Sequence, residues 1–369
     1  MPLRIESYRE EHEPAVVAFN ERGKANNAPF GLSKTWLAGW LPKKEDAPVY
    51  REFFLALDGK EVRGGFTLRR QPFWLHGEEV AAANYQGPLA ESLWDRRYMM
   101  AGVQLLRAAL REQPLLYALG MGGLDQPLPR QLASAGWALA PVPFRFKVIR
   151  AARFLRNIQP LRRNRSRALI LDLAAISGLG PLAVHAWQGL RQKASAKGAT
   201  AQQEKAFGPW ADEVWSATRA KYEFCAVRDA RHLQATFGTT ADRNLILRCT
   251  RQDQTIGWAL VRVTAMKADK YFGDLRVGSL IDALAIPGEE GAIAALATQH
   301  LRSLGADLVV TNQSHAAWLD ALAANGFLHG PSNFIFAASP TLAETLGPLE
   351  KALPTIHFNR ADGDGPIHL

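Results

Sequence analysis

Polar side chains gather at the ends of two apolar segments in the second half of the chain. Asp282 lies within LIDALA, and a charge among aliphatic residues needs a partner. The run TNQSH places Asn312 and His315 at the end of a predicted strand, where α/β folds tend to bind ligands. We therefore expect Asp282, Asn312 and His315 to bind substrate, with Asp282 and His315 as an acid/base pair. In the alternative interpretation, Ser314 is simply the N-cap of a helix over 316–325.

The first half offers two candidates beside a predicted strand over 80–86. Glu91 follows this strand, where a carboxylate at the mouth of an apolar cleft could act as general base, directly or through water, with its pKa raised by burial. Tyr85, within the strand, could donate a proton. Both have structural alternatives: Glu91 as an exposed loop carboxylate or helix cap, and Tyr85 as a core aromatic.

Other catalytic patterns are missing from the sequence. It has no CxxC pair, no HExxH helix and no Ser-His-Asp order, so zinc-enzyme and hydrolase functions have no support and we expect no metal. The segment DGDG at 362–365 hints at calcium but lacks the other ligands of a loop site, which favours a flexible turn.

The candidates lie on two copies of one pattern. One copy reads LLYALGMGGLDQPLPRQLASAGW and the other ADLVVTNQSHAAWLDALAANGF: an apolar strand, a polar break, an amphipathic helix and a Gly-aromatic pair. Upstream, each copy has a strand with its own Gly-aromatic pair. Gly65 precedes Gly136 by 71 residues, and Gly257 precedes Gly326 by 69. This repetition predicts a duplicated α/β domain.

Hydrophobic patterning and turn residues predict the elements that position these residues. In the first copy we expect strands at 3–7, 52–58, 62–70, 80–86, 115–119 and 144–149, and helices at 14–24, 97–111 and 129–135. In the second copy we expect strands at 169–173, 245–250, 256–264, 277–285, 308–311 and 334–338, and helices at 185–193, 204–221, 289–304 and 316–325.

The composition is that of an ordinary globular chain. Its 369 residues are 47% hydrophobic and 21% charged, enough for two sizeable cores. The two cysteines, Cys225 and Cys249, exclude a disulfide framework and fit a reducing compartment. The polar N-terminus does not resemble a signal peptide, and no run approaches the roughly 18 apolar residues of a membrane helix. We therefore expect a cytoplasmic protein with no membrane span.

The formal net charge of +9 is concentrated in one place. Seven arginines fall between Arg150 and Arg167, with no acidic residue among them. We interpret 151–167 as a solvated basic linker between domains at 1–150 and 168–342, followed by a tail at 343–369. The alternative is a patch that binds RNA or acidic lipid.

The order of elements, with a helix running into Gly-aromatic before a last strand, resembles the GNAT superfamily of acyl-CoA N-acyltransferases. The resemblance covers almost the whole chain and implies two tandem GNAT-like α/β domains, each a mixed, mostly antiparallel twisted sheet flanked by helices. It implies an acyl-CoA, most simply acetyl-CoA, as a substrate, and an amine of a small molecule or peptide as the acceptor. In the family, acyl-pantetheine slots between splayed fourth and fifth strands, here 80–86 and 115–119.

The family motif R/Q-x-x-G-x-G/A holds the CoA pyrophosphate on backbone N–H groups at a helix N-terminus. Here RYMMAG matches it at Arg97 and Gly102, while Met100 replaces the middle glycine and fits only if that position needs no positive φ. The resemblance implies a cofactor-binding role for Arg97, Met99, Met100, Ala101, Gly102 and Val103. The second copy has PGEEGA at 287–292, whose two carboxylates disfavour an anion, so we expect it to bind CoA poorly or not at all.

The tyrosine that many family members use as general acid is missing, because Leu132 and Leu322 stand at its positions. Either a different residue serves or the domain does not catalyse. The sequence therefore predicts an N-acyltransferase whose N-terminal domain binds CoA and whose C-terminal domain is degenerate. Two alternatives stay open: a Fem-type peptidyltransferase that takes an aminoacyl group from tRNA, and a non-catalytic tandem-GNAT binding module.

Overall fold

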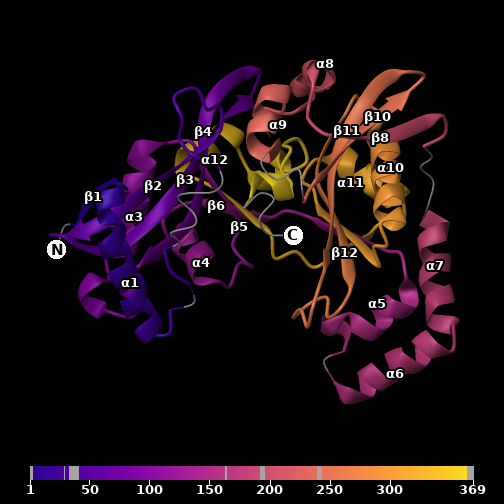
Figure 1. The fold of residues 1–369 in the computed structure, drawn as a ribbon, viewed down its shortest axis with the longest axis horizontal. Coiled ribbons are helices and arrows are strands. Elements are labelled where there is room, and N and C mark those ends of the chain that lie inside the picture. Colours follow the sequence, from indigo (N-terminus) through magenta and orange to yellow (C-terminus); the bar gives the residue numbers. More distant parts are fainter. Residues whose placement is uncertain are drawn as a thin grey trace. The chain divides into compact units, whose positions relative to one another are not determined.

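The computed structural model describes residues 3–28, 30–32, 41–162, 164–191, 196–238 and 243–363 (Figure 1). The chain divides into two compact units. Unit 1 comprises residues 1–140 and 335–349, and unit 2 comprises residues 141–334 and 350–369. Each unit contains a mixed sheet flanked by helices, as the family resemblance implies.

Unit 1 contains a sheet with the strand order β1-β2-β3-β4-β5-β15-β6. Its strands span Arg4–Ser7 (β1), Tyr50–Asp58 (β2), Glu61–Leu75 (β3), Glu78–Ala90 (β4), Leu116–Gly120 (β5), Ala138–Pro141 (β6) and Ile335–Ala338 (β15). Strands β1 to β4 are antiparallel neighbours, whereas β5 runs parallel to β4. The hairpin turns after β2 and β3 contain Gly59 and Gly77, whose φ of 61° and 96° favour glycine.

Helices pack on both faces of this sheet. They are α1 (Glu13–Ala25), α3 (Ala101–Glu112), α4 (Pro127–Ser134) and α12 (Pro340–Leu346). Leu105 and Ala109 of α3, four residues apart, pack in one apolar cluster with Phe54 of β2. The next residue of β2, Leu55, packs instead with Phe19 of α1, because successive side chains of a strand point to opposite faces.

Unit 2 contains a sheet with the order β14-β7-β13-β12-β11-β10-β8. Its strands are β7 (Phe144–Val148), β8 (Ala199–Glu204), β10 (Leu245–Arg251), β11 (Gln254–Ala265), β12 (Arg276–Ala285), β13 (Leu308–Asn312) and β14 (Leu328–Gly330), and a short strand, β9 (Phe224–Ala226), also belongs to this unit. Its helices are α5 (Ala151–Asn157), α6 (Arg165–Ile176), α7 (Leu179–Arg191), α8 (Pro209–Thr218), α9 (Ala230–Phe237), α10 (Glu290–Ser303) and α11 (Ala316–Ala324). The core packs Ile293 of α10 and Trp318 of α11 against Ala259 and Ala283 of the sheet.

Each sheet includes a strand that the repeat pattern assigns to the other copy. The pattern predicts that 144–149 closes the first domain, but β7 pairs with β13 and β14 of unit 2. Conversely, β15 pairs with β5 of unit 1. Pro141 is the last residue of β6, and Pro143 favours an extended backbone at Val142, so the chain leaves β6 in an extended conformation. The limits of the compact units consequently differ from the domain limits expected at residues 150, 168 and 342.

Three predicted elements need correction. The segment 151–167 is not a bare linker, because Phe154 and Leu155 of α5 pack with the Ala175 side chain of α6 in an apolar cluster. The predicted strand 169–173 is wrong: its run of Leu and Ile residues belongs to α6. The predicted helix 204–221 is too long, since β8 ends at Glu204 and α8 begins only at Pro209, a residue suited to a first helical turn.

Candidate functional site

Strands β4 and β5 of unit 1 diverge after a short parallel pairing. They pair only at Ala83 with Leu116 and at Asn84 with Tyr117, although both strands, which are described throughout, continue beyond these residues. Adjacent parallel strands normally pair along their whole shared length. The family resemblance implies such a splay, because it places the acyl-pantetheine between these two strands.

A bulge in β4 lies in the diverging part of the strand. Thr67 of β3 faces Gln86 and Gly65 faces Leu89, so the two residues between them on β4, Gly87 and Pro88, share one partner position. A bulge bends its strand, and proline supplies no N–H to a neighbouring strand. The bulge at Gly87 and Pro88 therefore accounts for the divergence of β4 from β5.

Helix α3 begins next to this end of β4. Ala101, its first residue, shares an apolar cluster with Tyr85 and Ala90 of β4. No side chain caps the helix, and its first intrahelical bond runs from the Gln104 N–H to the Met100 carbonyl (3.0 Å). The N–H groups of residues 101 to 103 precede that bond, and such groups at a helix start favour an anion.

The backbone explains why methionine is tolerated in place of the motif's middle glycine. Met100 has φ −87° and ψ −5°, a helical conformation that any residue adopts. A Cβ on Gly102 would lie 3.1 Å from the side-chain nitrogen of Gln131, which is a flexible group.

Arg97 is exposed and pairs with Asp95 (2.6 Å) in the turn before the helix. The remaining expected binding residues are Met99, exposed, Ala101, buried, and Val103, half-buried.

The turn before α3 is fixed by Tyr98. Its hydroxyl lies 2.9 Å from Oδ2 of Asp58, and the guanidinium of Arg63 stacks over its ring at 4.4 Å. A cation over an aromatic face contributes about 1 kcal/mol. These contacts hold the 3-10 turn η3 (Arg96–Tyr98), and with it the start of α3, in one position.

Glu91 lies in η2 (Glu91–Leu93), directly after β4, and both of its carboxylate oxygens are bound. It is 3% exposed; Arg63 Nη1 donates to both oxygens (3.1 and 3.0 Å), and Arg22 donates through Nε and Nη2 (3.0 and 3.3 Å). A base must have an oxygen available for the proton that it takes. The ion pairs therefore favour a structural role, and catalysis by Glu91 stays a prediction.

Tyr85 is a core residue of unit 1. Its ring packs against Phe66 at 5.4 Å and Trp137 at 6.4 Å, and burial raises the pKa of its hydroxyl well above the usual range. This environment favours the structural alternative for Tyr85. The glycines after β5 are explained by their turn, since Gly120, Gly122 and Gly123 have φ of 98°, 78° and 124°.

Unit 2 repeats the divergence between its own two parallel strands. β12 and β13 pair from Val277 with Leu308 to Ser279 with Val310, and both continue further. Ile281 is an extra residue in β12 relative to β11, so a bulge again lies where the parallel strands separate. The two units therefore share the geometry that the repeat predicts.

In unit 2 the carboxyl-terminal segment, residues 356–363, lies between these separating strands. The Ser314 N–H, just after β13, donates to the Phe358 carbonyl (3.1 Å), and Ser314 Oγ accepts from the Phe358 N–H (2.8 Å). On the β12 side, Asn359 donates to Asp282, and the His357 Nε2 is 3.2 Å from the Ala283 carbonyl. The chain itself thus occupies the place that corresponds to the β4–β5 divergence of unit 1.

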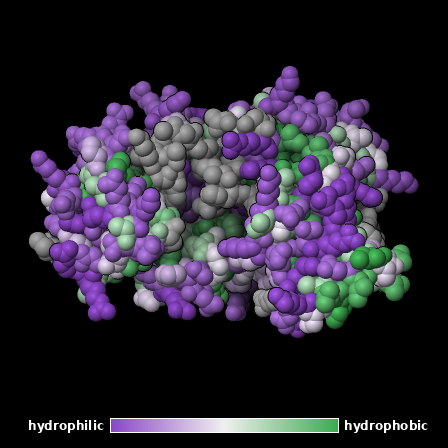
Figure 2. All heavy atoms as spheres, turned by 60° about the horizontal axis from the view of Figure 1, so that its bottom comes forward, coloured by the Kyte–Doolittle hydropathy of each residue, from purple (hydrophilic) through white to green (hydrophobic). Residues whose placement is uncertain are grey.

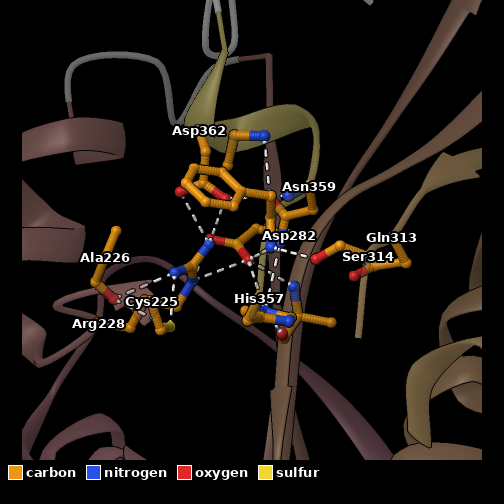
Figure 3. Close-up of polar contacts among 12 residues, drawn as sticks. Cys225, Ala226, Arg228, Asp282, Gln313, Ser314, His357, Asn359 and Asp362 are labelled. Atoms are coloured by element: carbon orange, nitrogen blue, oxygen red, sulfur yellow. Dashed lines mark hydrogen bonds and ion pairs between the residues drawn. The ribbon is translucent and has the colours of Figure 1, made fainter. Parts of the chain in front are cut away.

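A buried guanidinium links this segment to β12 (Figure 3). Arg228 Nε donates to both oxygens of Asp282 at 3.1 Å, and its Nη2 donates to both oxygens of Asp362 at 3.0 and 2.8 Å. Nη1 donates to the Cys225 sulfur and the Ala226 carbonyl, both at 3.1 Å. All five donors of the arginine side chain have partners in this arrangement.

One guanidinium faces two carboxylates in this interior. Burial, together with the charge of Asp362, raises the pKa of Asp282 to about 6, despite the opposing effect of Arg228. Burial also raises the pKa of the Cys225 thiol to about 12, so it is a thiol and not a thiolate. The cluster is therefore suited to holding the carboxyl-terminal segment in place, while its thiol is inert.

Two histidines near the cluster are neutral. Burial lowers the pKa of His357 well below its usual range, and its ring stacks on Tyr222 at 4.8 Å. Burial and the charge of Lys221 lower the pKa of His315 to about 4. Neither ring carries a charge near neutral pH, so neither is an ionic partner for Asp282 there.

The three residues expected to bind substrate lie in separate contacts. Asp282 pairs with Arg228, and not with His315 as the sequence predicted. Asn312 donates to the Val142 carbonyl (3.2 Å) and so ties down the chain before β7. His315, and not Ser314, is the N-cap of α11: its Nδ1 accepts from the Ala317 N–H (3.3 Å). These contacts are structural.

The start of α10 in unit 2 is occupied by carboxylates of the chain. Glu290, 5% exposed, pairs with Lys221 and accepts from the Gly288 N–H (3.0 Å). Glu289 pairs with Arg251 at 2.7 Å. Both carboxylates thus lie at the helix start where the sequence places them, and each is paired with a cation; weak binding of CoA by unit 2 stays a prediction.

Sequence reasoning missed Arg228 and Asp362, which bind each other in the cluster around Asp282, and it missed Asn359 and His357 beside them. The charge of Asp282 among aliphatic residues correctly indicated that a partner exists, but Arg228 lies 54 positions away in the chain. Nothing in the spacing could identify it. The sequence predicts that Asp362 lies in a flexible turn, whereas it is buried beside Arg228. Residues 364 and 365 of the same motif lie outside the described residues.

Comparison with known proteins identifies the fold. No protein-family model and no curated protein matches the chain. The GCN5-related N-acetyltransferase from Anabaena variabilis superposes over 94% of this chain and 75% of its own, with a TM-score of 0.57 and 12% identity. A conserved protein of unknown function from Enterococcus faecalis V583, a probable N-acyltransferase, gives the same coverages, a TM-score of 0.50 and 10% identity. The chain therefore has the fold of GNAT-type N-acyltransferases, in two GNAT-like units.

Proposed function

We propose that this protein is an acyl-CoA-dependent N-acyltransferase in which unit 1 binds the acyl donor and unit 2 does not. The observation that carries the proposal is a contrast between the two units. In unit 1 the divergence of β4 and β5 lies beside an uncapped helix start, whereas in unit 2 the chain's own residues 356–363 lie between β12 and β13.

The donor would be held by the start of α3. The N–H groups of residues 101 to 103 would bind the diphosphate of CoA, because aligned helix dipoles and unpaired donors both favour an anion. Arg97, whose side chain is 81% exposed, could add a charge-assisted hydrogen bond by leaving Asp95. The pantetheine and acyl group would extend between β4 and β5.

The reaction joins the acyl carbonyl carbon to the amine nitrogen and breaks the C–S bond. The amine gives up a proton and the CoA thiolate takes one, so the charges balance. Polarisation of the carbonyl by a preorganised backbone N–H group is the contribution that the bulged strand β4 is suited to make. We propose acetyl as the simplest acyl group and a small-molecule or peptide amine as the acceptor.

Binding of acetyl-CoA, measured by isothermal titration calorimetry, tests the donor site. We compare wild type with Gly102→Asp and Gly102→Asn, which add side chains of the same size next to Gln131. Only Asp places a negative charge beside the diphosphate. We expect Asp to weaken binding at least tenfold more than Asn, in line with a cost of about 1.4 kcal/mol or more for an opposed charge. Equal affinities of the two variants would remove α3 as the diphosphate site.

A second candidate function, a non-catalytic binding module, is favoured by one observation. Both residues predicted to move protons, Glu91 and Tyr85, are held in structural contacts. Turnover distinguishes the two functions: release of CoA thiol in the presence of a panel of amines supports the transferase. The module would be supported if the protein binds acyl-CoA tightly but releases CoA thiol no faster than the protein-free reaction with every amine of the panel.

A further inference from the structure

An apolar surface lies on α6 and α7 in unit 2, two consecutive helices that are bent by 82° at their junction and are called the hairpin below (Figure 2, lower right). Seven of the sixteen large apolar side chains that are exposed in the described part of the chain fall here. Six are aliphatic and between 64% and 70% exposed: Leu169, Ile170, Leu173, Ile176, Leu179 and Leu182. The seventh is Trp187. An exposed patch of this kind marks an interaction surface.

The hairpin is anchored by its other face, so the apolar side chains are not simply loose core residues. Ala175 of α6 packs with Phe154 and Leu155 of α5. Gln188 of α7 holds β7 through both backbone groups of Val148, accepting from its N–H (2.8 Å) and donating to its carbonyl (2.9 Å). With this face fixed on unit 2, the Leu and Ile residues of the opposite face stay uncovered.

The dimensions of the hairpin fit a membrane surface and not a membrane span. Among the described residues, no single helix is long and apolar enough to cross a membrane; α6 and residues 179–189 pass that test only together, and they are bent by 82° at their junction. The two helices have 12 and 13 residues. Each is thus about 18 to 20 Å long, short of the roughly 30 Å hydrocarbon core.

The charge around the hairpin selects an anionic surface. Residues 150–197 contain ten Lys or Arg and a single acidic residue, Asp172, a surplus that equals the +9 of the whole chain. Arg162 neutralises Asp172 at 2.8 Å. Arg156, Arg165 and Arg167 are exposed, and in the described residues none of them forms an ion pair. Arginines flanking exposed Leu, Ile and Trp are typical of segments that lie in the interface of anionic bilayers.

From these observations we infer that the α6–α7 hairpin docks this protein onto anionic phospholipid bilayers, with its Leu and Ile side chains in the acyl boundary and its arginines at the phosphates. The inference is independent of the proposed enzymatic function, since it uses no residue of the donor site. It predicts that the protein binds a membrane surface reversibly, because two short helices bury far less apolar surface than a spanning helix.

Sedimentation with large unilamellar vesicles tests the inference on the full chain. We expect binding to vesicles containing 30 mol% phosphatidylglycerol, and at least tenfold weaker binding to pure phosphatidylcholine. Arg165→Gln with Arg167→Gln should weaken binding to the anionic vesicles about fivefold per charge removed. Leu173→Asn with Ile176→Asn should weaken it at least tenfold. Leu93→Asn, at an apolar residue of unit 1 that is 55% exposed, is the matched control and should have no effect.

Trp187 supplies a direct readout of depth. Lipids brominated on the acyl chain should quench part of the fluorescence of wild type, and Trp187→Phe should lose that part, although nine other tryptophans remain. Equal binding to neutral and anionic vesicles, or no binding to either, would overturn the inference. A dimer would also overturn the inference if the protein does not bind vesicles. Such a dimer would depend on protein concentration in light scattering and would be abolished by Leu173→Asn with Ile176→Asn, because the hairpin would then join two copies.

Discussion

Arg228 and Asp282 face each other at 3.1 Å in the interior of unit 2, and each side chain is 2% exposed. The same guanidinium binds Asp362 on its far side at 2.8 Å. Asp282 belongs to the bulged strand β12, whereas Asp362 belongs to the carboxyl-terminal segment. The arginine therefore joins the segment to the strand, and it does so with one positive charge for two negative ones.

Removing the arginine is expected to be costly. Arg228→Met should lower the free energy of unfolding by about 3 to 5 kcal/mol at pH 7.5, because it leaves two buried carboxylates without their counter-charge. Urea unfolding followed by circular dichroism measures this loss. Arg228→Lys is the matched control: it keeps the charge but not the fork geometry, and should recover part of the loss. A change within 1 kcal/mol for Arg228→Met would contradict the buried-cluster assignment.

The pKa of Asp282 gives the cluster a pH dependence. Because its folded-state value of about 6 lies above the usual 3.8, the folded protein binds this proton more tightly than the unfolded chain does. The stability that the protonated Asp282 carboxyl group contributes is fully present below pH 4 and is lost as the pH rises through 6. Between pH 7 and pH 5, wild type should gain about 1.3 kcal/mol of stability relative to Asp282→Asn, and the gain should approach about 3 kcal/mol only below pH 4. Parallel pH profiles for the two proteins would show that the carboxyl group does not titrate in this range.

His315 should act in the opposite direction. Its folded-state pKa of about 4 lies below the usual 6.5, so unfolding takes up a proton once the pH falls below 6.5. The stability that the neutral ring provides is full above pH 6.5 and is lost as the pH falls through 4. Relative to His315→Gln, wild type should therefore lose about 3 kcal/mol between pH 7 and pH 4. Chemical unfolding at fixed pH steps measures both proteins, and a variant with the wild-type slope would rule out His315 as its source.

The sequence predicted the fold better than the site. Period-two strands, turn glycines such as Gly59 and Gly77, and the repeated Gly-aromatic pairs depend on local backbone chemistry, so they can be recognised without a structure. The exchange of β7 and β15 between the two sheets cannot be recognised from the sequence, because the residues of an apolar strand do not indicate which neighbouring strand it pairs with. The run of Leu and Ile residues in α6 predicts a strand instead of a helix for a related reason: its exposed apolar face breaks the amphipathic pattern of an ordinary surface helix.

Site residues were predicted unevenly for a physical reason. The carboxylates Glu289 and Glu290 lie at the start of α10 as sequence spacing predicts, because acidic residues are favoured in a first helical turn. The roles of Glu91 and Asp282, in contrast, depend on Arg63 and Arg228, which come from distant parts of the chain. The sequence predicts that the Glu91 carboxylate is a general base, but in the structure two guanidiniums bind it. Only three-dimensional contacts distinguish a general base from a structural ion pair.

Glu91 provides the sharpest test of that distinction. Its neighbours Arg63 and Arg22 are 11% and 32% exposed, so Glu91→Gln removes the carboxylate that binds both partly buried charges, although Arg63 keeps its pair with Glu61. We expect a loss of about 3 kcal/mol in unfolding free energy. If the contacts are structural, the transfer rate at saturating acyl-CoA should stay within about threefold of wild type at a temperature where the variant is folded. A general base would instead contribute about 10² to 10⁴-fold. Arg22→Met is the matched control, because it removes one of the two ion pairs of Glu91 while leaving both the carboxylate and the Arg63–Tyr98 contact in place. A rate that collapses in Glu91→Gln but survives in Arg22→Met would show that Glu91 is the base, since only the first variant removes the proton acceptor.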